Sequence, residues 1–573
     1  MAKFLSGILT GFLLIILIVV LAAVALTSRG TKSRTISDGS TLILRLSGDI
    51  PEKPALAFDI PFLPQRNQVT VEGVWNILRH AAADPRIKAI LFEPEGTTLG
   101  WAKMQEIRAD LETFRKSGKP LIAYLKAPGT REYYLASACS QIYMAPVDML
   151  DLKGLALQTL YFKGTLDKLG VTVDVEHAGK YKDFGDMFTR STMSAETREV
   201  MNGLADDLYS DLVSTIAKGR SKDDATIRAV IDNGPFLSSQ AKAAGLVDDL
   251  IYEDQVFTTL KNTLHQKELK KVSTATYASV TDSAAGLDAK DRIAWVVAEG
   301  SITRGDPDST DAGGLESEGF NKMLTRVAAD NKVKGVIVRI DSPGGEVAAS
   351  DEMLRAMGEL RKKKPVVISM SDTAASGGYY MAMSGDPILA YPSTLTGSIG
   401  VVFGKPNLHG LYDKVGVSKE SVSRGRFALI ESDYESLTEA GRQKLREGID
   451  ANYEDFVAKV AKARKQPVSV IEPLAQGRVW LGARARGNGL VDEIGGIDRA
   501  IEMIKAKAGI PATSRVSLVT WPPKRSLLDL AFKSGNDSEA DALLHAAGLD
   551  PAAIRVWLRG GMLRLMPVTI NIR

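Results

Sequence analysis

Ser376 is the residue in this sequence best placed to act as a nucleophile. It lies in the segment Asp372-Thr-Ala-Ala-Ser-Gly-Gly-Tyr-Tyr, at a predicted turn between a strand and a helix. The small neighbours allow another backbone to come close, and the N-terminus of the following helix favours developing negative charge. These residue types at this spacing therefore indicate nucleophilic chemistry at Ser376.

A second glycine-rich turn, Ser342-Pro343-Gly344-Gly345, lies upstream, again just after a predicted strand. Amide N–H groups at Gly344 or Gly345, together with one at Gly377 or its neighbour, could form an oxyanion hole because no side chain obstructs them. Either turn by itself is more often a tight turn or a helix cap than a functional feature. Their occurrence together favours the functional interpretation, and the sequence leaves open which glycine donates.

The serine needs a base, and histidine is the usual one. The chain has five histidines, scattered without metal-ligand spacing, and His409 has no acidic partner nearby in sequence. A Ser/His/Asp triad and a metal site are therefore both disfavoured, and we expect no cofactor. A lysine in an apolar pocket loses its proton more readily, so a Ser/Lys pair is the favoured alternative.

The chain contains two copies of one unit. Asp84-Pro-Arg-Ile-Lys-Ala-Ile-Leu matches Asp330-Asn-Lys-Val-Lys-Gly-Val-Ile at an offset of 246 residues, and Tyr133-Tyr134 matches Tyr379-Tyr380 at the same offset. Matches that keep one register over most of the unit indicate an internal duplication.

The two copies differ at the positions that could carry chemistry. Thr130 occupies the place of Ser376 in the first copy, and Gly96-Thr-Thr-Leu99 replaces the glycine pair, so only the second copy has a nucleophile. The first copy has lysines in Gly179-Lys-Tyr-Lys182, where the second has Gly425-Arg-Phe-Ala428. The serine and the lysine are thus divided between the copies.

Lys180 and Lys182 are both candidates for the base. A strand would place them on the same face, so periodicity does not separate them. Most lysines are solvated at the surface, and one that acts as a base near neutral pH needs a pKa well below the usual ~10.4. The neighbouring Phe184, Met187 and Phe188 could supply the apolar cover that lowers it.

The elements that must position these residues alternate between strands and helices. In the second copy, residues 333–340 and 365–370 are typical of buried strands, residues 347–360 have helical spacing, and another helix begins near Tyr379. This alternation predicts an α/β fold with mainly parallel sheets covered by helices. Both glycine-rich turns follow strands and precede helices, which is where α/β proteins place functional residues.

The duplication and the composition divide the chain into five segments. We expect an anchor and linker at 1–40, a first repeat at 41–254, a connector at 255–291, a second repeat at 292–509 and a C-terminal tail at 510–573. The sequence assigns no role to the tail.

Residues 4–26 contain no charged side chain. As a helix they would extend roughly 34 Å, enough to span a hydrocarbon core of ~30 Å. A removable secretory signal is the alternative, since Ala23-Val-Ala25 has the A-x-A form, but such signals have only about 7 to 15 apolar residues. We expect a retained anchor in a lipid bilayer, whose flanking charges do not decide its orientation.

The overall composition excludes several classes of protein. The 573 residues are 45% hydrophobic and 25% charged, which is typical of globular proteins and excludes a disordered chain or a coiled coil. A formal net charge of +3 does not favour a nucleic-acid partner. The single cysteine, Cys139, cannot form an internal disulfide.

Three motifs resemble those of one known family: residues 342–345, residues 372–380 and Thr396-Gly-Ser-Ile-Gly400. With the duplication, they resemble peptidase family S49 in its long two-repeat form, within the caseinolytic-protease/crotonase superfamily. The resemblance implies two tandem crotonase-like repeats, a transmembrane anchor and a serine endopeptidase with a Ser/Lys dyad. It also implies a homotetramer at the bacterial cytoplasmic (inner) membrane, with its catalytic part facing the periplasm, that degrades cleaved signal peptides.

The resemblance also selects among the candidate residues. The family pattern Gly-x-Tyr-Lys identifies Lys182 rather than Lys180 as the base, which would meet Ser376 across the two repeats. Ser398 matches the family's accessory serine and would hydrogen-bond the lysine. A turn serine bonded to local backbone explains Ser398 equally well.

Two other functions are open from the sequence. Crotonase-type relatives use similar turns to hold acyl-CoA thioesters, but Ser376 would then be redundant. An inactive membrane scaffold is the second alternative, since the first repeat has already lost its nucleophile at Thr130. The retention of complementary residues in opposite repeats argues against a scaffold.

Overall fold

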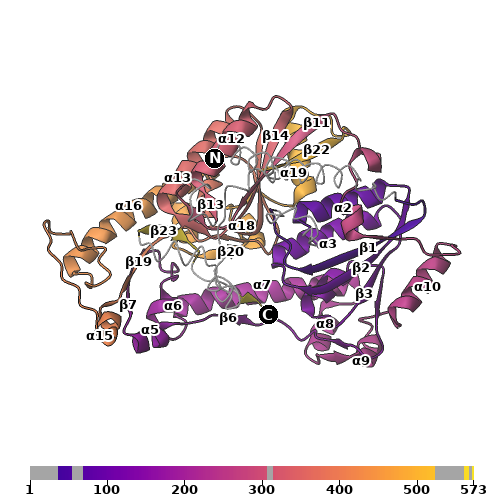
Figure 1. Ribbon diagram of the computed structural model, residues 1–573, viewed down its shortest axis with the longest axis horizontal. Coiled ribbons are helices and arrows are strands. Elements are labelled where there is room, and N and C mark those ends of the chain that lie inside the picture. Colours follow the sequence, from indigo (N-terminus) through magenta and orange to yellow (C-terminus); the bar gives the residue numbers. More distant parts are fainter. Residues whose placement is uncertain (1–35, 54–68, 306–313, 523–560, 567–570, 573) are drawn as a thin grey trace, which may run out of the picture.

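The computed structural model describes residues 36–53, 69–305, 314–522, 561–566 and 571–572. The described chain forms two α/β halves that pack side by side, the first indigo to magenta and the second rose to orange in Figure 1. The predicted anchor at 4–26 lies outside these residues. Among the described helices, none combines the length and the apolar character needed to cross a bilayer.

The first half is built on a six-stranded sheet whose neighbouring strands all pair in parallel. The strands, in their order across the sheet, are β10 Lys271–Ser273, β1 Ser40–Gly48, β2 Ile87–Thr97, β3 Leu121–Leu125, β4 Gln141–Met144 and β9 Asp249–Leu250. The central strands are apolar on both faces because helices cover both sides of a parallel sheet.

Helices of the first half bury apolar side chains against this sheet. One face is covered by α2 Val71–Ala83, α3 Trp101–Arg115, α4 Thr130–Ala136, α7 Ala195–Gly219 and α8 Asp224–Ile231. The other face is covered by α10 Glu253–Thr263. The shorter elements of this half are β5 Met149–Leu150, β6 Leu157–Gln158, α5 Lys163–Leu169, α6 Asp186–Thr189, β8 Phe236–Leu237, α9 Ser238–Ala243, α11 Thr274–Tyr277 and the 3₁₀ turn Ser283–Ala285.

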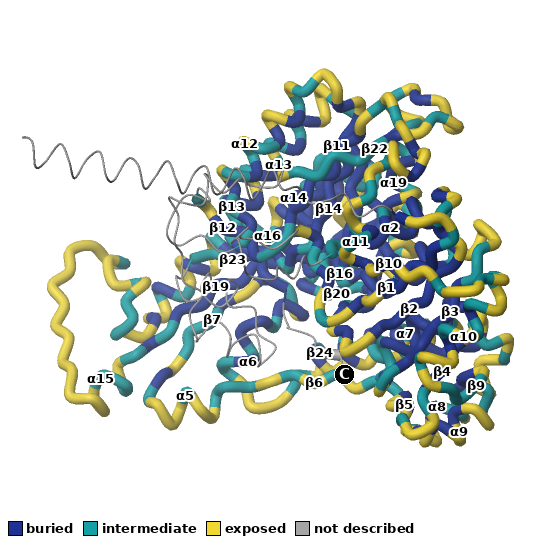
Figure 2. The backbone as a smooth tube through the Cα atoms, turned by 45° about the vertical axis from the view of Figure 1, so that its right-hand side comes forward, coloured by how far each residue is buried: buried dark blue, intermediate teal, exposed yellow. Residues whose placement is uncertain are grey.

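The second half repeats this plan. Its sheet runs β20 Val479–Leu481, β18 Leu395–Gly397, β16 Val366–Ala375, β14 Val333–Ser342, β11 Asp291–Glu299 and β22 Val516–Trp521, with β17 Ile388–Ala390 and β21 Glu493–Ile494 branching from β16. The helices are α12 Ser317–Ala329, α13 Val347–Arg361, α14 Gly377–Met381, α15 His409–Val415, α16 Glu439–Arg464, α17 Val468–Ile471, α18 Gly482–Gly487 and α19 Ile497–Ala508. Figure 2 shows β14 and β16 as buried strands inside this layer.

The elements predicted in the second copy are present. The strands at 333–340 and 365–370 are β14 and β16, and the helix at 347–360 is α13. Among the described residues, four strands occur where the sequence predicted none, and two of them are β23 Met562–Leu565 and β24 Asn571–Ile572 in the tail. The other two are β10, within residues 255–291, and β22, within residues 510–573. Each forms the edge beside the first strand of its half, so both copies complete their sheets with a late strand.

A third sheet joins the two halves. Its order is β13 Leu315–Glu316, β12 Ile302–Thr303, β15 Gly344–Glu346, β23 Met562–Leu565, β19 Val401–Asn407 and β7 Thr172–Ala178. β7 comes from the first half and pairs antiparallel with β19 of the second, with Ala178 opposite Val401. Both strands extend away from the main body toward α5 and α15 (Figure 1). This pairing carries the residues after β7 into the second half.

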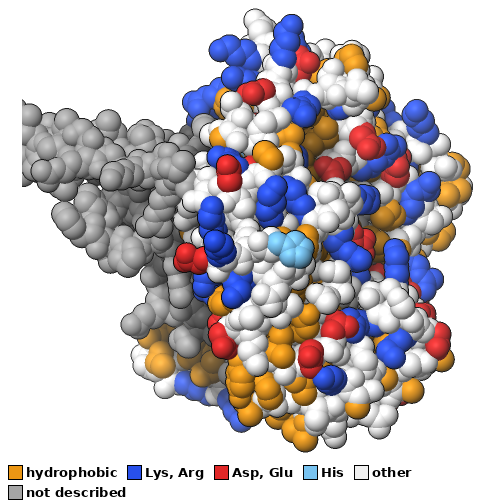
Figure 3. All heavy atoms as spheres, turned by 90° about the vertical axis from the view of Figure 1, so that its right-hand side faces the viewer, with side chains coloured by type: hydrophobic (Ala, Val, Ile, Leu, Met, Phe, Trp, Pro, Cys, Tyr) orange, Lys and Arg blue, Asp and Glu red, His pale blue; other side chains and the backbone are white. Residues whose placement is uncertain are grey.

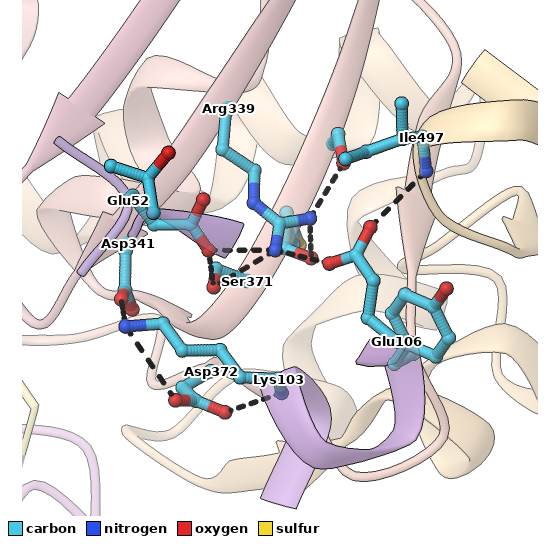
Figure 4. Close-up of polar contacts among 12 residues, drawn as sticks. Glu52, Lys103, Glu106, Arg339, Asp341, Ser371, Asp372 and Ile497 are labelled. Atoms are coloured by element: carbon cyan, nitrogen blue, oxygen red, sulfur yellow. Dashed lines mark hydrogen bonds and ion pairs between the residues drawn. The ribbon is translucent and has the colours of Figure 1, made fainter. Parts of the chain in front are cut away.

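A buried arginine fastens the halves together (Figure 4). Arg339 on β14 has no exposed surface, and its guanidinium lies 2.7 Å from Glu52 and also contacts Glu106 of α3. Its other contacts include Ser371 Oγ at 3.1 Å. The amide of Ile497, in the second half, donates to Glu106 at 3.2 Å. Removing charges from water is costly unless they are paired, so this contact requires both halves to be in place.

A second ion pair holds α3 against β16, the strand that leads to Ser376. Lys103 Nζ lies 2.9 Å from Asp341 and 3.9 Å from Asp372, and the Lys103 amide donates to Asp372 at 2.9 Å. Burial raises the pKa of Asp372 to about 7, against the opposing attraction of Lys103. The helix begins after Gly100, where a Cβ would lie 2.2 Å from the Asp372 carboxyl group. The first half therefore contacts β16 four residues before the serine.

Arg339→Met is expected to lower the free energy of unfolding by about 3–5 kcal/mol, because two carboxylates would stay buried without their cation. Arg499→Met is the matched control, since Arg499 also pairs with two carboxylates, those of Glu493 and Glu502, but the three side chains are 42%, 40% and 63% exposed. Its cost should not exceed about 1 kcal/mol. Urea unfolding of the two variants measures both values, and equal losses would contradict a fastening role for Arg339.

Candidate active site

Ser376 occupies the single residue between β16 and α14. Its backbone has φ +54° and ψ −113°, a region that residues other than glycine rarely adopt. The Ser376 amide donates to the Gly397 carbonyl at 2.8 Å, and its carbonyl accepts from the Tyr380 amide at 2.8 Å. These bonds hold the strained turn between strand and helix, which fixes the direction of the Ser376 side chain.

The structure brings Lys182 of the first half to this serine. Lys182 Nζ lies 2.7 Å from Ser376 Oγ, 2.9 Å from Ser398 Oγ and 2.9 Å from the Ser398 carbonyl oxygen. None of the three residues has exposed surface. The nucleophile, base and accessory serine predicted from the sequence thus meet in one buried group.

Two glycines of the second half make room for the lysine. The Tyr181 amide donates to Gln476 O at 2.8 Å, which docks the loop after β7. A Cβ on Gly477 would lie 2.5 Å from Lys182 N, and a Cβ on Gly400 would lie 3.0 Å from Lys182 Cδ. Sequence analysis included Gly400 only as part of a motif and did not single out Gly477, because this close approach exists only between the folded halves.

Burial lowers the pKa of Lys182 well below its usual value, and the positive charge of Arg564 acts in the same direction, against Asp183. The three oxygen contacts include no carboxylate. A neutral amine has two N–H donors and one lone pair. The two donors match the carbonyl and hydroxyl oxygens of Ser398, and the lone pair matches the hydroxyl proton of Ser376. The arrangement therefore suits a lysine that accepts the serine proton.

The rival bases lie elsewhere. Lys180 is exposed, and its Nζ stands 4.6 Å from the centre of the Tyr181 ring. His409 is 48% exposed and stacks on Tyr434. Phe184 and Met187 are buried in one apolar cluster, against which Phe188 packs. Among the described residues, no three His, Cys, Asp or Glu side chains are grouped so that they could hold a metal ion.

The three predicted oxyanion glycines converge beside Ser376. A Cβ on Gly344, where φ is +103°, would lie 2.6 Å from Gly377 N. A Cβ on Gly377 would in turn lie 3.1 Å from Gly345 N. The Gly344 amide donates to Ser342 Oγ at 3.2 Å. Only glycine permits this approach of two backbones, and it brings the Gly344–Gly345 turn against the Gly377 amide, next to the serine.

Comparison with known proteins gives two matches within the chain to the same family. The model of peptidase family S49 matches residues 113–267, which include Lys182, and residues 358–511, which include Ser376 and Ser398. The predicted duplication is therefore confirmed as two repeats of one domain. The chain is also similar to individual proteins, to two of those described next over most of its length.

Three relatives illustrate this similarity. The chloroplastic serine protease SPPA of Arabidopsis thaliana is 37% identical over 87% of this chain and 74% of its own length. Protease 4 of Haemophilus influenzae is 30% identical over 86% of this chain and 82% of its own. A protein of Enterococcus faecium, provisionally named signal peptide peptidase SppA, is 35% identical over 33% of this chain and 55% of its own.

The lowered pKa of Lys182 predicts a pH dependence of stability. Between its folded pKa and 10.5, the unfolded chain holds a proton at Lys182 that the folded chain lacks, so this residue makes the free energy of unfolding rise with pH. Lys182→Met removes that slope, which amounts to at most about 1.4 kcal/mol per pH unit. Urea unfolding across alkaline pH compares it with the wild type and with Lys180→Met. An unchanged slope in Lys182→Met would contradict a neutral buried amine.

Proposed function

Since this chain belongs to peptidase family S49 and is a serine protease, we propose that Ser376 and Lys182 form its catalytic dyad. The observation that carries this proposal is the distance of 2.7 Å between Lys182 Nζ and Ser376 Oγ, in a site without exposed surface. Neither an acyl-CoA site nor an inactive scaffold explains why a lysine of one repeat is buried against a serine of the other.

The reaction follows from these contacts. Lys182 takes the proton of Ser376 as Oγ attacks the scissile carbonyl carbon, and the carbonyl oxygen becomes an oxyanion bonded by the Gly377 amide and a neighbouring glycine amide. When the C–N bond breaks, the lysine ammonium returns its proton to the leaving amine. Water then attacks the acyl-enzyme with Lys182 again as base, which releases the acid product and restores Ser376.

Ser398 has a positioning role in this proposal. Its carbonyl and hydroxyl oxygens both contact Lys182 Nζ at 2.9 Å, so they orient the amine with its lone pair toward Ser376. Ser398 itself has φ +51°, a strained backbone held by a hydrogen bond from its amide to Arg478 O at 2.7 Å. This third group restricts the amine to the direction that proton transfer needs.

The substrates proposed here are unfolded apolar peptides, in particular cleaved signal peptides. Support comes from the name of the Enterococcus faecium relative and from the uncharged segment at 4–26, which would anchor the enzyme in the bacterial cytoplasmic membrane with its catalytic part facing the periplasm. An anchored enzyme meets membrane-derived peptides at a raised effective concentration.

A homotetramer is the assembly we propose, and the duplication supports a contact between copies. Helices α3 and α13 correspond at the repeat offset, and each has 15 residues. Most of α3 is buried, its apolar side chains in the core of the first half and Lys103, Gln105 and Glu106 against the second half. Glu352 is the counterpart of Glu106 on α13, and its side chain is 41% exposed. A second copy could cover α13 as the second half covers α3, which makes a head-to-tail contact that can close into a ring.

Ser376→Ala and Lys182→Ala should each reduce hydrolysis of an unstructured apolar peptide by at least about 10³-fold, since each removes one member of the dyad. Lys180→Ala is the matched control two residues away and should keep the wild-type rate. Steady-state kinetics on the purified full chain in detergent measures the three variants. Retained activity in both dyad variants would refute the proposed mechanism.

Glu352→Arg should convert the assembly to smaller species, because its counterpart in the first half is buried in an interface. Glu359→Arg on the same helix is the control, because its counterpart Thr113 is exposed. Sedimentation velocity of the full chain in detergent distinguishes the two. A Glu352→Arg variant that sediments like the wild type would rule out this contact between copies.

A further inference from the structure

Three consecutive residues of the second half, 476–478, lie between the loop that contains Lys182 and the turn that contains Ser398. The first of their carbonyls accepts from the Tyr181 amide at 2.8 Å, and the last accepts from the Ser398 amide at 2.7 Å. The amide between them donates to the Ile399 carbonyl at 2.7 Å. Residues 476–478 thus bond to both sides of the site, so their position sets the distance between the lysine and the accessory serine.

This segment is strained and is held by side chains. Gln476 has φ +54°, in the left-handed region that residues other than glycine rarely adopt. Its amide donates to the Tyr453 hydroxyl at 3.2 Å, and its side-chain amide donates to Glu472. A strained backbone persists only where its surroundings fix it, so the side chains around residues 476–478 are part of what positions the site.

The side chain of Arg478 links this segment to the first half. Its Nη1 lies 2.6 Å from Glu199 Oε1 and 3.1 Å from the Tyr181 hydroxyl, which itself donates to Glu199 Oε2 at 3.1 Å. Glu199 belongs to α7, which passes beside β20 (Figure 1). Arg478, Glu199 and Tyr181 therefore form one hydrogen-bonded group across the two halves, called here the Arg478 network.

The guanidinium of Arg478 also contacts the neighbours of both members of the dyad. It stands 4.9 Å from the centre of the Tyr181 ring and 4.6 Å from that of Trp480. Tyr181 directly precedes the lysine. A Cβ on Gly397 would lie 2.8 Å from Trp480 Cδ1, and the Gly397 carbonyl accepts from the Ser376 amide at 2.8 Å. One cation thus lies between supports of the base and of the nucleophile.

The exposure of the network indicates a local role. The Tyr181 side chain is buried, whereas those of Arg478 and Glu199 are 23% and 53% exposed. An ion pair so close to water adds little to the stability of the whole fold. A misplacement of ~1 Å in a catalytic group can nevertheless cost about 100-fold in rate. The contact therefore matters more for the place of the lysine loop than for folding.

We propose that Arg478 and Glu199 are positioning residues for the catalytic base. They hold Tyr181 against residues 476–478, which keeps Lys182 Nζ on the Ser398 oxygens and within reach of Ser376. The inference rests on the proposed Ser/Lys dyad and adds the two charged residues that hold it in register across the halves.

Arg478→Met in the full chain should lower kcat for an unstructured apolar peptide at least about tenfold and change KM less than about twofold. The acidic limb of the pH profile of kcat/KM should move to higher pH, because an amine that water reaches holds its proton more strongly. Asp183 and Arg564, the charged groups that act on Lys182, stay unaltered. A lower kcat with an unmoved acidic limb would contradict the positioning role.

Arg484→Met is the matched control. Arg484 of α18 makes two hydrogen bonds of 2.8 Å to Asp207, so it also joins the second half to α7 by an ion pair. It should keep the wild-type kcat and pH profile, since its partner lies eight residues along α7 from Glu199. Equal effects of the Arg478 and Arg484 substitutions would mean that any ion pair between the halves supports the site, and the proposal would be wrong.

A double-mutant cycle tests whether the two charged residues act as one unit. Glu199→Ala should lower kcat in the same direction, and Arg478→Met with Glu199→Ala should lose no more than Arg478→Met alone, because the second change removes a contact already lost. Losses that multiply in the double variant would show that Glu199 does not act through Arg478.

A further measurement does not depend on activity. The rise of the free energy of unfolding that Lys182 contributes between about pH 7 and 9 should be reduced in Arg478→Met and retained in Arg484→Met, because only the first variant lets water reach the amine. Urea unfolding of the full chain in detergent measures it, and an unreduced slope in Arg478→Met contradicts the proposal. If the wild type hydrolyses no peptide, the proposed function fails, and this slope alone decides whether Arg478 holds the lysine in place.

Discussion

The arrangement depends on one buried contact, the lysine amine of one repeat against the serine hydroxyl of the other. An amine without an ionic partner is stable in such a place mainly in its neutral form, because burial penalises the charge. That same neutrality makes it a base for Ser376 at 2.7 Å. Desolvation, which destabilises most charged groups, here provides the chemical property that the site needs.

Such a contact demands that two separate halves be held to within a few tenths of an ångström. The antiparallel pairing of β7 with β19 brings the loop that contains Lys182 to the second half. The lack of a side chain at Gly400 and at Gly477 leaves room for Lys182. Near the strand that leads to the serine, the contacts of Lys103 with Asp341 and of Glu106 with Arg339 tie α3 to the second half. The ionic contacts are costly to break singly, so they favour one relative position of the halves.

The duplication explains why the serine and the lysine come from different repeats. Each repeat keeps the sheet and its covering helices, but only one keeps the strained serine turn and only the other keeps the lysine. On the face seen in Figure 3, Lys and Arg side chains are interspersed with Asp and Glu side chains, and the net charge of the chain is +3. Such a balance of charge gives no long-range attraction for a strongly charged partner.

The sequence alone determined the α/β class, the duplication, the position of the strained serine between strand and helix, and the glycines beside it, because these follow from local periodicity and from one repeat register. Strand periodicity did not decide whether Lys180 or Lys182 is the base, since both would project to one face of a strand. Only the family pattern favoured Lys182. The tertiary structure separates them on physical grounds, by burying Lys182 and leaving Lys180 in solvent. It alone also placed β23 between β15 and β19 and required glycine at 477. Contacts between segments hundreds of residues apart leave no period in the chain, so packing rather than local pattern decides them.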